Sequence, residues 1–113
     1  MPPKNNPLKL NNLQLKTLTL LQEIARQPDL TSTDEETGET VIRALPHAHG
    51  NHFHIGRLTV MSADATGLNN QAVWTALIRK GLLRQVDQGY VVTEAGAGYE
   101  TGLRDSILHG SDH

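Results

Sequence analysis

Four histidines lie close together near the middle of this 113-residue chain. They follow the pattern His-x-His-x-x-His-x-His and are His47, His49, His52 and His54. Imidazole is the commonest metal ligand in proteins, and residues two apart on a strand project from the same face. In a hairpin that turns near Gly50 and Asn51, three such rings can hold a zinc or nickel ion. Two other interpretations stay open, namely solvated turn histidines and a contact that responds to pH near neutrality.

A second group of polar side chains lies between residues 69 and 88. Amide side chains read adenine edges or bind phosphate oxygens, while arginine and lysine bind phosphates. The candidates for such contacts are Asn69, Asn70, Gln71, Thr75, Arg79, Lys80, Arg84 and Gln88. Residues 41–86 carry five basic side chains and one acid, whereas the segments on both sides are acidic. A structural alternative is that the two asparagines only cap a helix and that Lys80 only compensates the charge at its end.

The composition argues against several other kinds of chemistry. The absence of cysteine excludes a disulfide framework, a thiolate zinc site and cysteine catalysis, and it fits a cytoplasmic protein. No apolar run approaches the ~20 residues that a membrane span needs, and the first residues lack the apolar stretch of a secretory signal. We find no Ser-His-Asp grouping, dinucleotide fingerprint or phosphate loop, so we expect no enzyme. A net charge of −2 also argues against binding nucleic acid by charge alone.

The first half of the chain should supply one helix and one hairpin. Leucines and an isoleucine recur at helical spacing from Leu13, so we expect a helix that is capped by Asn11 or Asn12 and ends near Pro28. Residues 29–40 are polar and acidic and are expected to form a loop. Residues 41–45 and 53–55 then predict the two strands of a β-hairpin whose turn is residues 47–51.

The second half should place the polar group on a helix. We expect a short helix at residues 62–66 that Gly67 ends, a helix at residues 69–80 that Gly81 ends, and a hairpin of strands 83–86 and 90–93. Trp74 is assigned to the core or to a partner interface rather than to a base contact. Residues 94–103 are compatible with a last helix. The predicted organisation is a flexible arm (1–10), one domain (11–104) and a flexible tail (105–113).

One part of this order of elements resembles a known family. The segment Ala65-Thr66-Gly67-Leu68, the polar helix start after it and the closing Leu77-Ile78-Arg79-Lys80-Gly81-Leu82 look like the helix-turn-helix of winged-helix regulators. The segment Tyr90-Val91-Val92-Thr93-Glu94-Ala95-Gly96 is similar to the second wing strand and the following helix start of MarR-type transcriptional regulators. The resemblance covers residues 62–100.

The resemblance implies an α+β fold of the winged helix-turn-helix class. It has a three-helix core, a C-terminal helix and a wing hairpin, to which this chain adds a hairpin between the first two helices. The implied function is a transcriptional regulator that places the helix of residues 69–80 in the major groove of double-stranded DNA. A homodimer is expected, through the first and last helices, because one small module buries little DNA surface. The alternatives are a protein-interaction module of the same fold and a metal- or pH-responsive regulator that uses the His47–His54 cluster.

Overall fold

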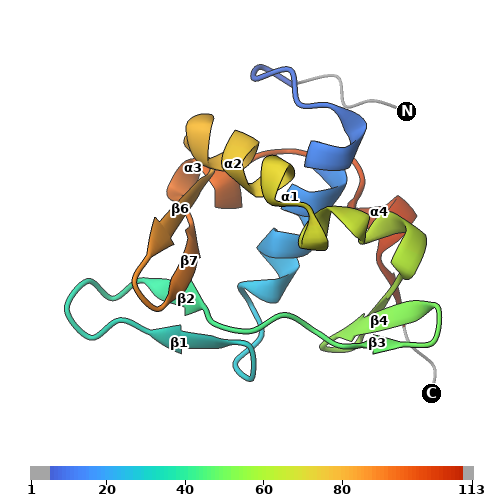
Figure 1. Cartoon of the computed structure of the whole chain (residues 1–113), viewed down its shortest axis with the longest axis horizontal. Coiled ribbons are helices and arrows are strands. Elements are labelled where there is room, and N and C mark those ends of the chain that lie inside the picture. The colour runs from blue at the N-terminus through green and yellow to red at the C-terminus, as the bar shows by residue number, and fades with distance from the viewer. Residues whose placement is uncertain (1–5, 111–113) are drawn as a thin grey trace.

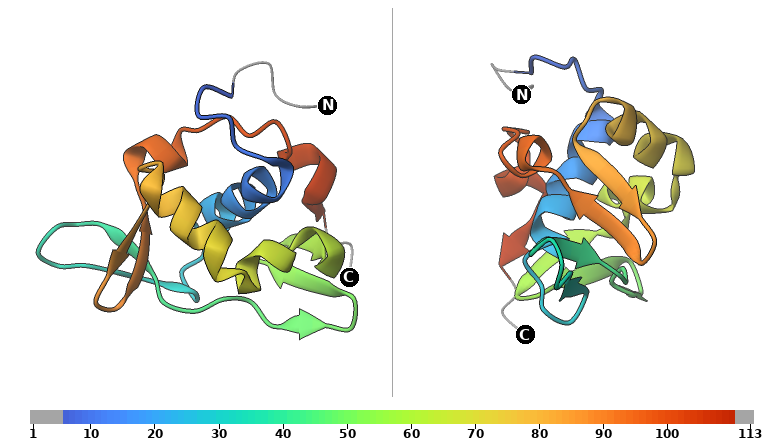
Figure 2. Two further views of the ribbon diagram at one scale, coloured as in Figure 1. Left: turned by 45° about the horizontal axis from the view of Figure 1, so that its top comes forward. Right: turned by 90° about the vertical axis from the view of Figure 1, so that its left-hand side faces the viewer.

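The structure, a computed structural model, describes residues 6–110. Within these residues the strands form two small antiparallel sheets, which Figure 1 shows at opposite ends of the longest axis, with the helices above them. The right-hand view of Figure 2 shows the first helix, α1, between α2 on one side and α3 and α4 on the other. The expected α+β class is therefore confirmed.

Helix α1 (Asn12–Ile24) forms the centre of the core. Its start is a capping box, in which the Gln14 N–H donates to Asn11 Oδ1 (2.8 Å) and the Asn11 N–H donates to Gln14 Oε1 (3.0 Å). The helix is buried on several sides, so even Thr17 and Thr19 lie inside, where each hydroxyl donates to the carbonyl four residues earlier. The helix predicted from the leucine spacing is confirmed, and Asn11 is its cap.

The first sheet has the strand order β1-β2-β7-β6, with β1 (Thr31–Thr33), β2 (Thr40–Ile42), β6 (Leu83–Val86) and β7 (Gly89–Val92). The β6–β7 hairpin confirms the predicted strands 83–86 and 90–93. The expected loop at 29–40 is wrong in part, because it contains β1, a polar strand that pairs through its backbone and shows no apolar alternation. The β2–β7 pairing depends on Gly89, where a Cβ would lie 2.0 Å from the Ile42 carbonyl oxygen.

The second sheet has the order β3-β4-β5-β8, with β3 (Ala48–His49), β4 (His52–Ile55), β5 (Leu58–Met61) and β8 (His109–Gly110). The predicted hairpin of 41–45 with 53–55 is wrong, because β2 joins the first sheet and β4 pairs with its neighbours in the sequence. Gly50 (φ 68°) and Gly56 (φ 60°) have left-handed backbone, which allows a two-residue turn on each side of β4. The inserted unit is therefore a three-stranded meander joined by β8.

The helix expected at residues 62–66 is replaced by two short 3₁₀ turns, η1 (Ser62–Asp64) and η2 (Thr66–Asn69). Gly67 was expected to end a helix in the left-handed conformation, but it lies within η2. A Cβ at Gly67 would lie 1.8 Å from Thr17 Oγ1, so this glycine allows η2 to pack against α1. Helix α2 (Gln71–Arg79) follows its cap Asn70 and stops before Gly81 (φ 77°), which confirms the predicted helix apart from its first residues.

The described parts of both chain ends, which flank the predicted domain of residues 11–104, make contacts with it. Leu10 is buried, and the Tyr99 hydroxyl donates to Asn6 and accepts the Leu8 N–H. The helix expected at residues 94–103 is limited to α3 (Glu94–Ala97), and a further short helix, α4 (Arg104–Ile107), follows that range; Leu108 is buried before β8 begins. The rest of the predicted arm (1–5) and of the predicted tail (111–113) lies outside the described residues.

An ion pair attaches the C-terminal segment to α1. The carboxylate of Glu23, which is buried, accepts a hydrogen bond from Arg104 in α4 and lies 3.7 Å from the Arg26 guanidinium. The hydrogen bond to Glu23 raises the pKa of Arg104 above its ordinary value. Thr19 Oγ1, whose own hydrogen is donated to the Leu15 carbonyl, accepts from the Thr101 hydroxyl at 2.7 Å, so these polar groups inside the protein are paired.

Candidate functional site

The exposed side of α2 carries much of the predicted polar group. Asn70 caps the helix, because its Oδ1 accepts the Ala72 N–H at 3.1 Å. Asn69 and Gln71 flank this cap, are exposed, and make no side-chain hydrogen bond to another described residue. Thr75 is half-buried one turn further along. The structure therefore assigns the cap to Asn70 and leaves the neighbouring amides open to solvent.

The opposite side of α2 is fixed in the core. Val73 and Leu77 are buried, and Trp74 is 5% exposed. The indole Nε1–H donates to the carbonyl oxygens of Gly67 (3.1 Å) and Leu68 (3.2 Å), and its ring centroid lies 4.6 Å from that of Tyr90. The predicted core position of Trp74 is confirmed. These contacts set the rotation of α2 about its own axis, and so determine which side chains face outward.

The basic residues of the predicted group do not share one surface. Arg79 is exposed at the end of α2, and Lys80 Nζ donates to the Leu8 carbonyl at 2.9 Å. Arg84 forms an ion pair with Glu39. Gln85 pairs with Tyr90 in the β6–β7 register, and Arg84 pairs with Val91, so Arg84 lies on the sheet face away from α2. The structure thus separates Arg84 from the other candidates.

Sequence reasoning missed Gln85, which is exposed on the α2 side of the hairpin. The signal was available, because Leu83 is an apolar residue at the start of β6 and its strand neighbours must alternate between the two faces. Gln85 therefore shares the face of Leu83, and Arg84 does not. The alternation of side chains along β6, rather than their charge, identifies those that lie on the same side of the sheet as α2.

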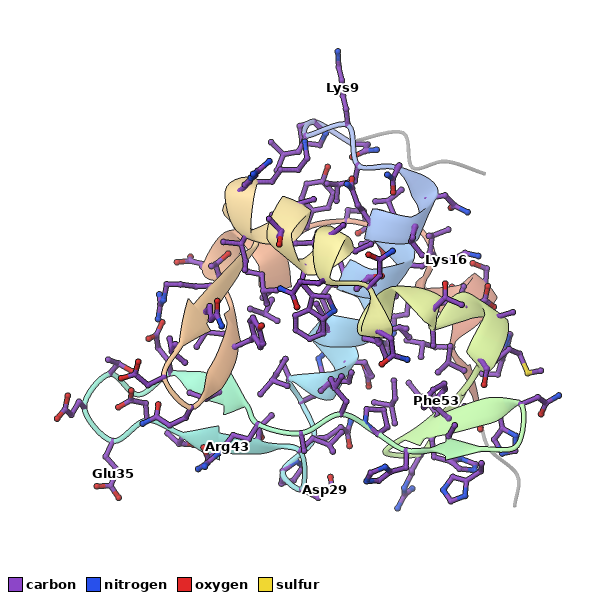
Figure 3. All side chains as sticks on the ribbon, viewed as in Figure 1. Lys9, Lys16, Asp29, Glu35, Arg43 and Phe53 are labelled. Atoms are coloured by element: carbon purple, nitrogen blue, oxygen red, sulfur yellow. The ribbon has the colours of Figure 1, made fainter. Side chains whose placement is uncertain are left out.

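Acidic side chains lie beside the tip of the β6–β7 hairpin. Gln88 lines a hollow of about 460 Å³ together with Arg43 and the acids of the β1–β2 loop, Asp34, Glu35 and Glu36. Figure 3 shows Glu35 projecting from the end of that loop. Gln88 therefore has mixed-charge surroundings, which make this end of the sheet a poor place for phosphates.

A slot of about 360 Å³ opens between the start of α2 and the first sheet. Its inner wall is formed by Trp74, Tyr90, Leu68 and Ile42, and its rim carries Asn69, Gln71 and Arg43. The slot combines an aromatic wall with amide and guanidinium groups at its mouth, a composition typical of pockets that receive a side chain or small ligand.

The histidines gather on one sheet. His52 Nε2 and His54 Nε2 are 3.2 Å apart, and the ring centroid of His49 lies 5.4 Å from that of His54 and 6.3 Å from that of His52. His47 lies before β3 and lines a cavity of about 360 Å³ with His49, His54 and Asp29. Between residues 6 and 110, no group of three or more His, Cys, Asp or Glu side chains is already arranged to hold a metal ion.

Comparison of the chain with protein-family models, with curated proteins and with solved structures gave no significant match. None of the helices in the described part of the chain combines the length and the apolar character of a bilayer-spanning segment. The function is therefore inferred from the placement of the side chains described above.

Proposed function

We propose that this protein is a winged-helix module that binds double-stranded DNA, with α2 entering the major groove. The observation that carries the proposal is the two-sided character of α2. One side is held in the core by Val73, Trp74 and Leu77, while the other presents polar and basic side chains to solvent. No acid occurs between residues 66 and 81, so nothing on this helix repels phosphates.

The order of elements supports the winged-helix part of the proposal. The helix α1, the helix α2, the hairpin β6–β7 and the helix α3 follow one another in the order that the resemblance implies, with the turns η1 and η2 in place of the expected second helix. Strand β2, from the segment before the turns, pairs with β7 and attaches the hairpin to the body of the protein. The inserted meander β3–β5 lies in the second sheet, away from α2.

The proposal gives different roles to the predicted contact residues. Asn69, Gln71 and Thr75 lie where base edges can be read, and Arg79 lies where a phosphate would pass the end of the helix. Lys80 can join it by exchanging the Leu8 carbonyl for a phosphate oxygen. Asn70 acts as the cap. The ion pair of Arg84 and the acids near Gln88 remove these two residues from the proposed contact surface, so DNA binding depends on α2.

Fluorescence anisotropy with the untagged chain and a pool of random duplexes tests this function. We expect binding at low salt that weakens as salt rises, with a log–log slope of about −0.9 for each phosphate contact. Arg79→Ala should weaken binding and reduce this slope by about one contact. Arg57→Ala is the matched control, because Arg57 is an exposed arginine in the turn between β4 and β5. No binding at low salt, or equal losses in both variants, would contradict the proposal.

The same proposal includes a homodimer in transcription control. One module of this size covers too little DNA for high specificity, and a second copy on a neighbouring half-site would double the contact. Sedimentation velocity of the chain with a selected duplex measures the number of copies bound. A complex that holds one chain at saturation would contradict the dimer and leave the contact of α2 with DNA to be judged by the anisotropy experiment.

A protein-interaction module remains the second candidate, and the aromatic slot beside α2 favours it. Trp74 and Tyr90 form a wall that a partner's apolar side chain can contact, and Arg43 stands at the mouth. Tyr90→Ala distinguishes the two functions, because Tyr90 lines the slot and is not among the proposed base-reading residues. A protein-interaction role predicts two results. The Tyr90→Ala variant loses partner binding, and the wild-type chain shows no affinity for duplex DNA.

A further inference from the structure

The second sheet brings several imidazoles to one face. Residues directly opposite each other in antiparallel strands share a face, and so do residues two apart on one strand. His49 pairs with His52, His54 pairs with Thr59, and Thr59 pairs with His109 on β8. His49, His52, His54 and His109 therefore lie on the same side of the sheet. His109 falls in the segment that was predicted to be a flexible tail.

The other face of this sheet is packed against the core. Ile55 and Val60 are fully buried there, and Figure 3 shows Phe53 pointing from β4 toward the helices. This packing fixes the alternation along β4, so His52 and His54 are held on the outer face by the core residues between and beside them. His52 and His54 therefore lie on a strand that the core supports.

The distance between two of the ring nitrogens matches that between two ligands of one metal ion. His52 Nε2 and His54 Nε2 are 3.2 Å apart, and their rings are nearly perpendicular, at 88°. Two imidazoles bound to one ion at about 2.0–2.1 Å place their nitrogens about 2.9 Å apart at a right angle and about 3.4 Å apart in tetrahedral geometry. The observed separation falls between these limits.

Neighbouring side chains orient the two rings for this role. His52 Nδ1 lies 3.3 Å from Asn51 Oδ1, and an amide oxygen can only accept, so the proton of a neutral His52 ring sits on Nδ1. His54 Nδ1 lies 3.4 Å from Thr59 Oγ1 and accepts from this hydroxyl, so the proton of a neutral His54 ring is on Nε2 and is donated to His52 Nε2. A metal ion bound by both Nε2 atoms would replace the proton between them, while the contacts at Nδ1 hold the two rings in place.

We propose that this imidazole face binds a divalent transition-metal ion of the zinc, nickel and copper class, with His52 Nε2 and His54 Nε2 as the first two ligands and His49 as the third. His49 is the nearest further ring, and a change of its rotamer on the exposed edge strand β3 would complete the set. Ligands of nitrogen alone favour these metals over magnesium and calcium, which prefer oxygen. This site is separate from α2 and does not depend on the proposed DNA function.

Isothermal titration of the untagged full chain with zinc chloride and with nickel chloride tests the site. We expect one ion per chain, and we expect His52→Ala/His54→Ala to weaken binding at least about 10-fold. His109→Ala is the matched control. It removes an imidazole from the same face, but two strand spacings of about 4.8 Å separate it from His54, so affinity should stay within about twofold.

Nuclear magnetic resonance of the wild-type chain provides a second measurement that does not depend on the folding of a variant. Zinc should shift the ring nitrogen resonances of His52, His54 and His49 and leave those of His109 in place. The proposal is overturned if the wild-type chain binds no ion, if the double substitution weakens binding by less than about 10-fold, or if His109→Ala weakens binding as much as the double substitution.

Discussion

The two ends of this molecule display polar side chains in opposite ways. Around α2, Asn69 and Gln71 at its start and Arg79 at its end are exposed to solvent and form no hydrogen bonds with one another. On the second sheet, by contrast, the rings of His49, His52 and His54 have centroids 4.8 to 6.3 Å apart. Dispersed groups on a rigid helix suit an extended partner, whereas converging ring nitrogens suit a single ion. This contrast underlies the two proposals, a DNA duplex for the α2 region and a metal ion for the second sheet.

The largest expected effect comes from disturbing the packing of η2 against α1, which supports the α2 region. Gly67→Ala should lower the free energy of unfolding by about 3 kcal/mol, because the new Cβ would lie 1.8 Å from Thr17 Oγ1. In a Thr17→Ala background the cost should fall by about 1 kcal/mol or more, since the clashing oxygen is absent. Gly110→Ala in the second sheet meets no atom within 4 Å and serves as the control. Urea unfolding of the wild type, the three single variants and the Thr17→Ala/Gly67→Ala double variant measures these free energies. Equal losses of stability in Gly67→Ala and Gly110→Ala would contradict the packing described.

A crossed set of variants tests whether the two regions act independently. His52→Ala/His54→Ala should lower metal affinity at least about 10-fold and leave DNA affinity unchanged. Gln71→Ala/Arg79→Ala should lower DNA affinity by a similar factor, because a bidentate contact contributes about 1–3 kcal/mol of discrimination. Titration calorimetry and fluorescence anisotropy on the same preparations measure both. Loss of DNA affinity in the histidine variant would show that the two regions form one site.

The sequence predicts the α2 region better than the second sheet, and the reason is the range of the interactions. The capping residues Asn11 and Asn70 and the stop at Gly81 act within a few residues of the helix they bound, so the local pattern is sufficient. The partner of β2 is β7, from a distant part of the chain, and no local pattern carries that information. The predicted β2–β4 hairpin was wrong for this reason.

The candidate residues follow the same rule. The four clustered histidines were visible in the sequence, but His109 joins their face only through the pairing of β8 with β5. Arg84 was included for its charge, whereas the register of β6 with β7 turns it away from α2. Residue type predicts which chemistry is available, and strand register decides which of these groups meet.

Two adjacent asparagines in the α2 region have different expected roles. Asn70 stabilises the helix as its cap, whereas Asn69 is a proposed contact with DNA. Asn70→Ala should lower the free energy of unfolding by about 1 kcal/mol, because the Ala72 N–H loses its acceptor. Asn69→Ala should change stability by less than about 0.5 kcal/mol, since the side chain is exposed. DNA affinity should show the reverse order when measured where both variants are fully folded. If Asn69→Ala is the more destabilising of the two, the cap has been assigned to the wrong residue.

The smallest expected effect concerns Arg84. Substituting it tests whether DNA affinity depends on where a positive charge lies or only on the net charge. Its partner Glu39 directly precedes β2, and both side chains are partly exposed, so the ion pair should contribute at most about 1 kcal/mol to stability. Arg84→Ala should therefore change thermal unfolding slightly and leave DNA affinity within about twofold of the wild type, whereas Arg79→Ala should weaken it clearly. Both substitutions remove one positive charge, so long-range attraction changes equally and only direct contact differs. If Arg84→Ala weakened DNA binding as much as Arg79→Ala, net charge rather than the surface of α2 would govern the interaction.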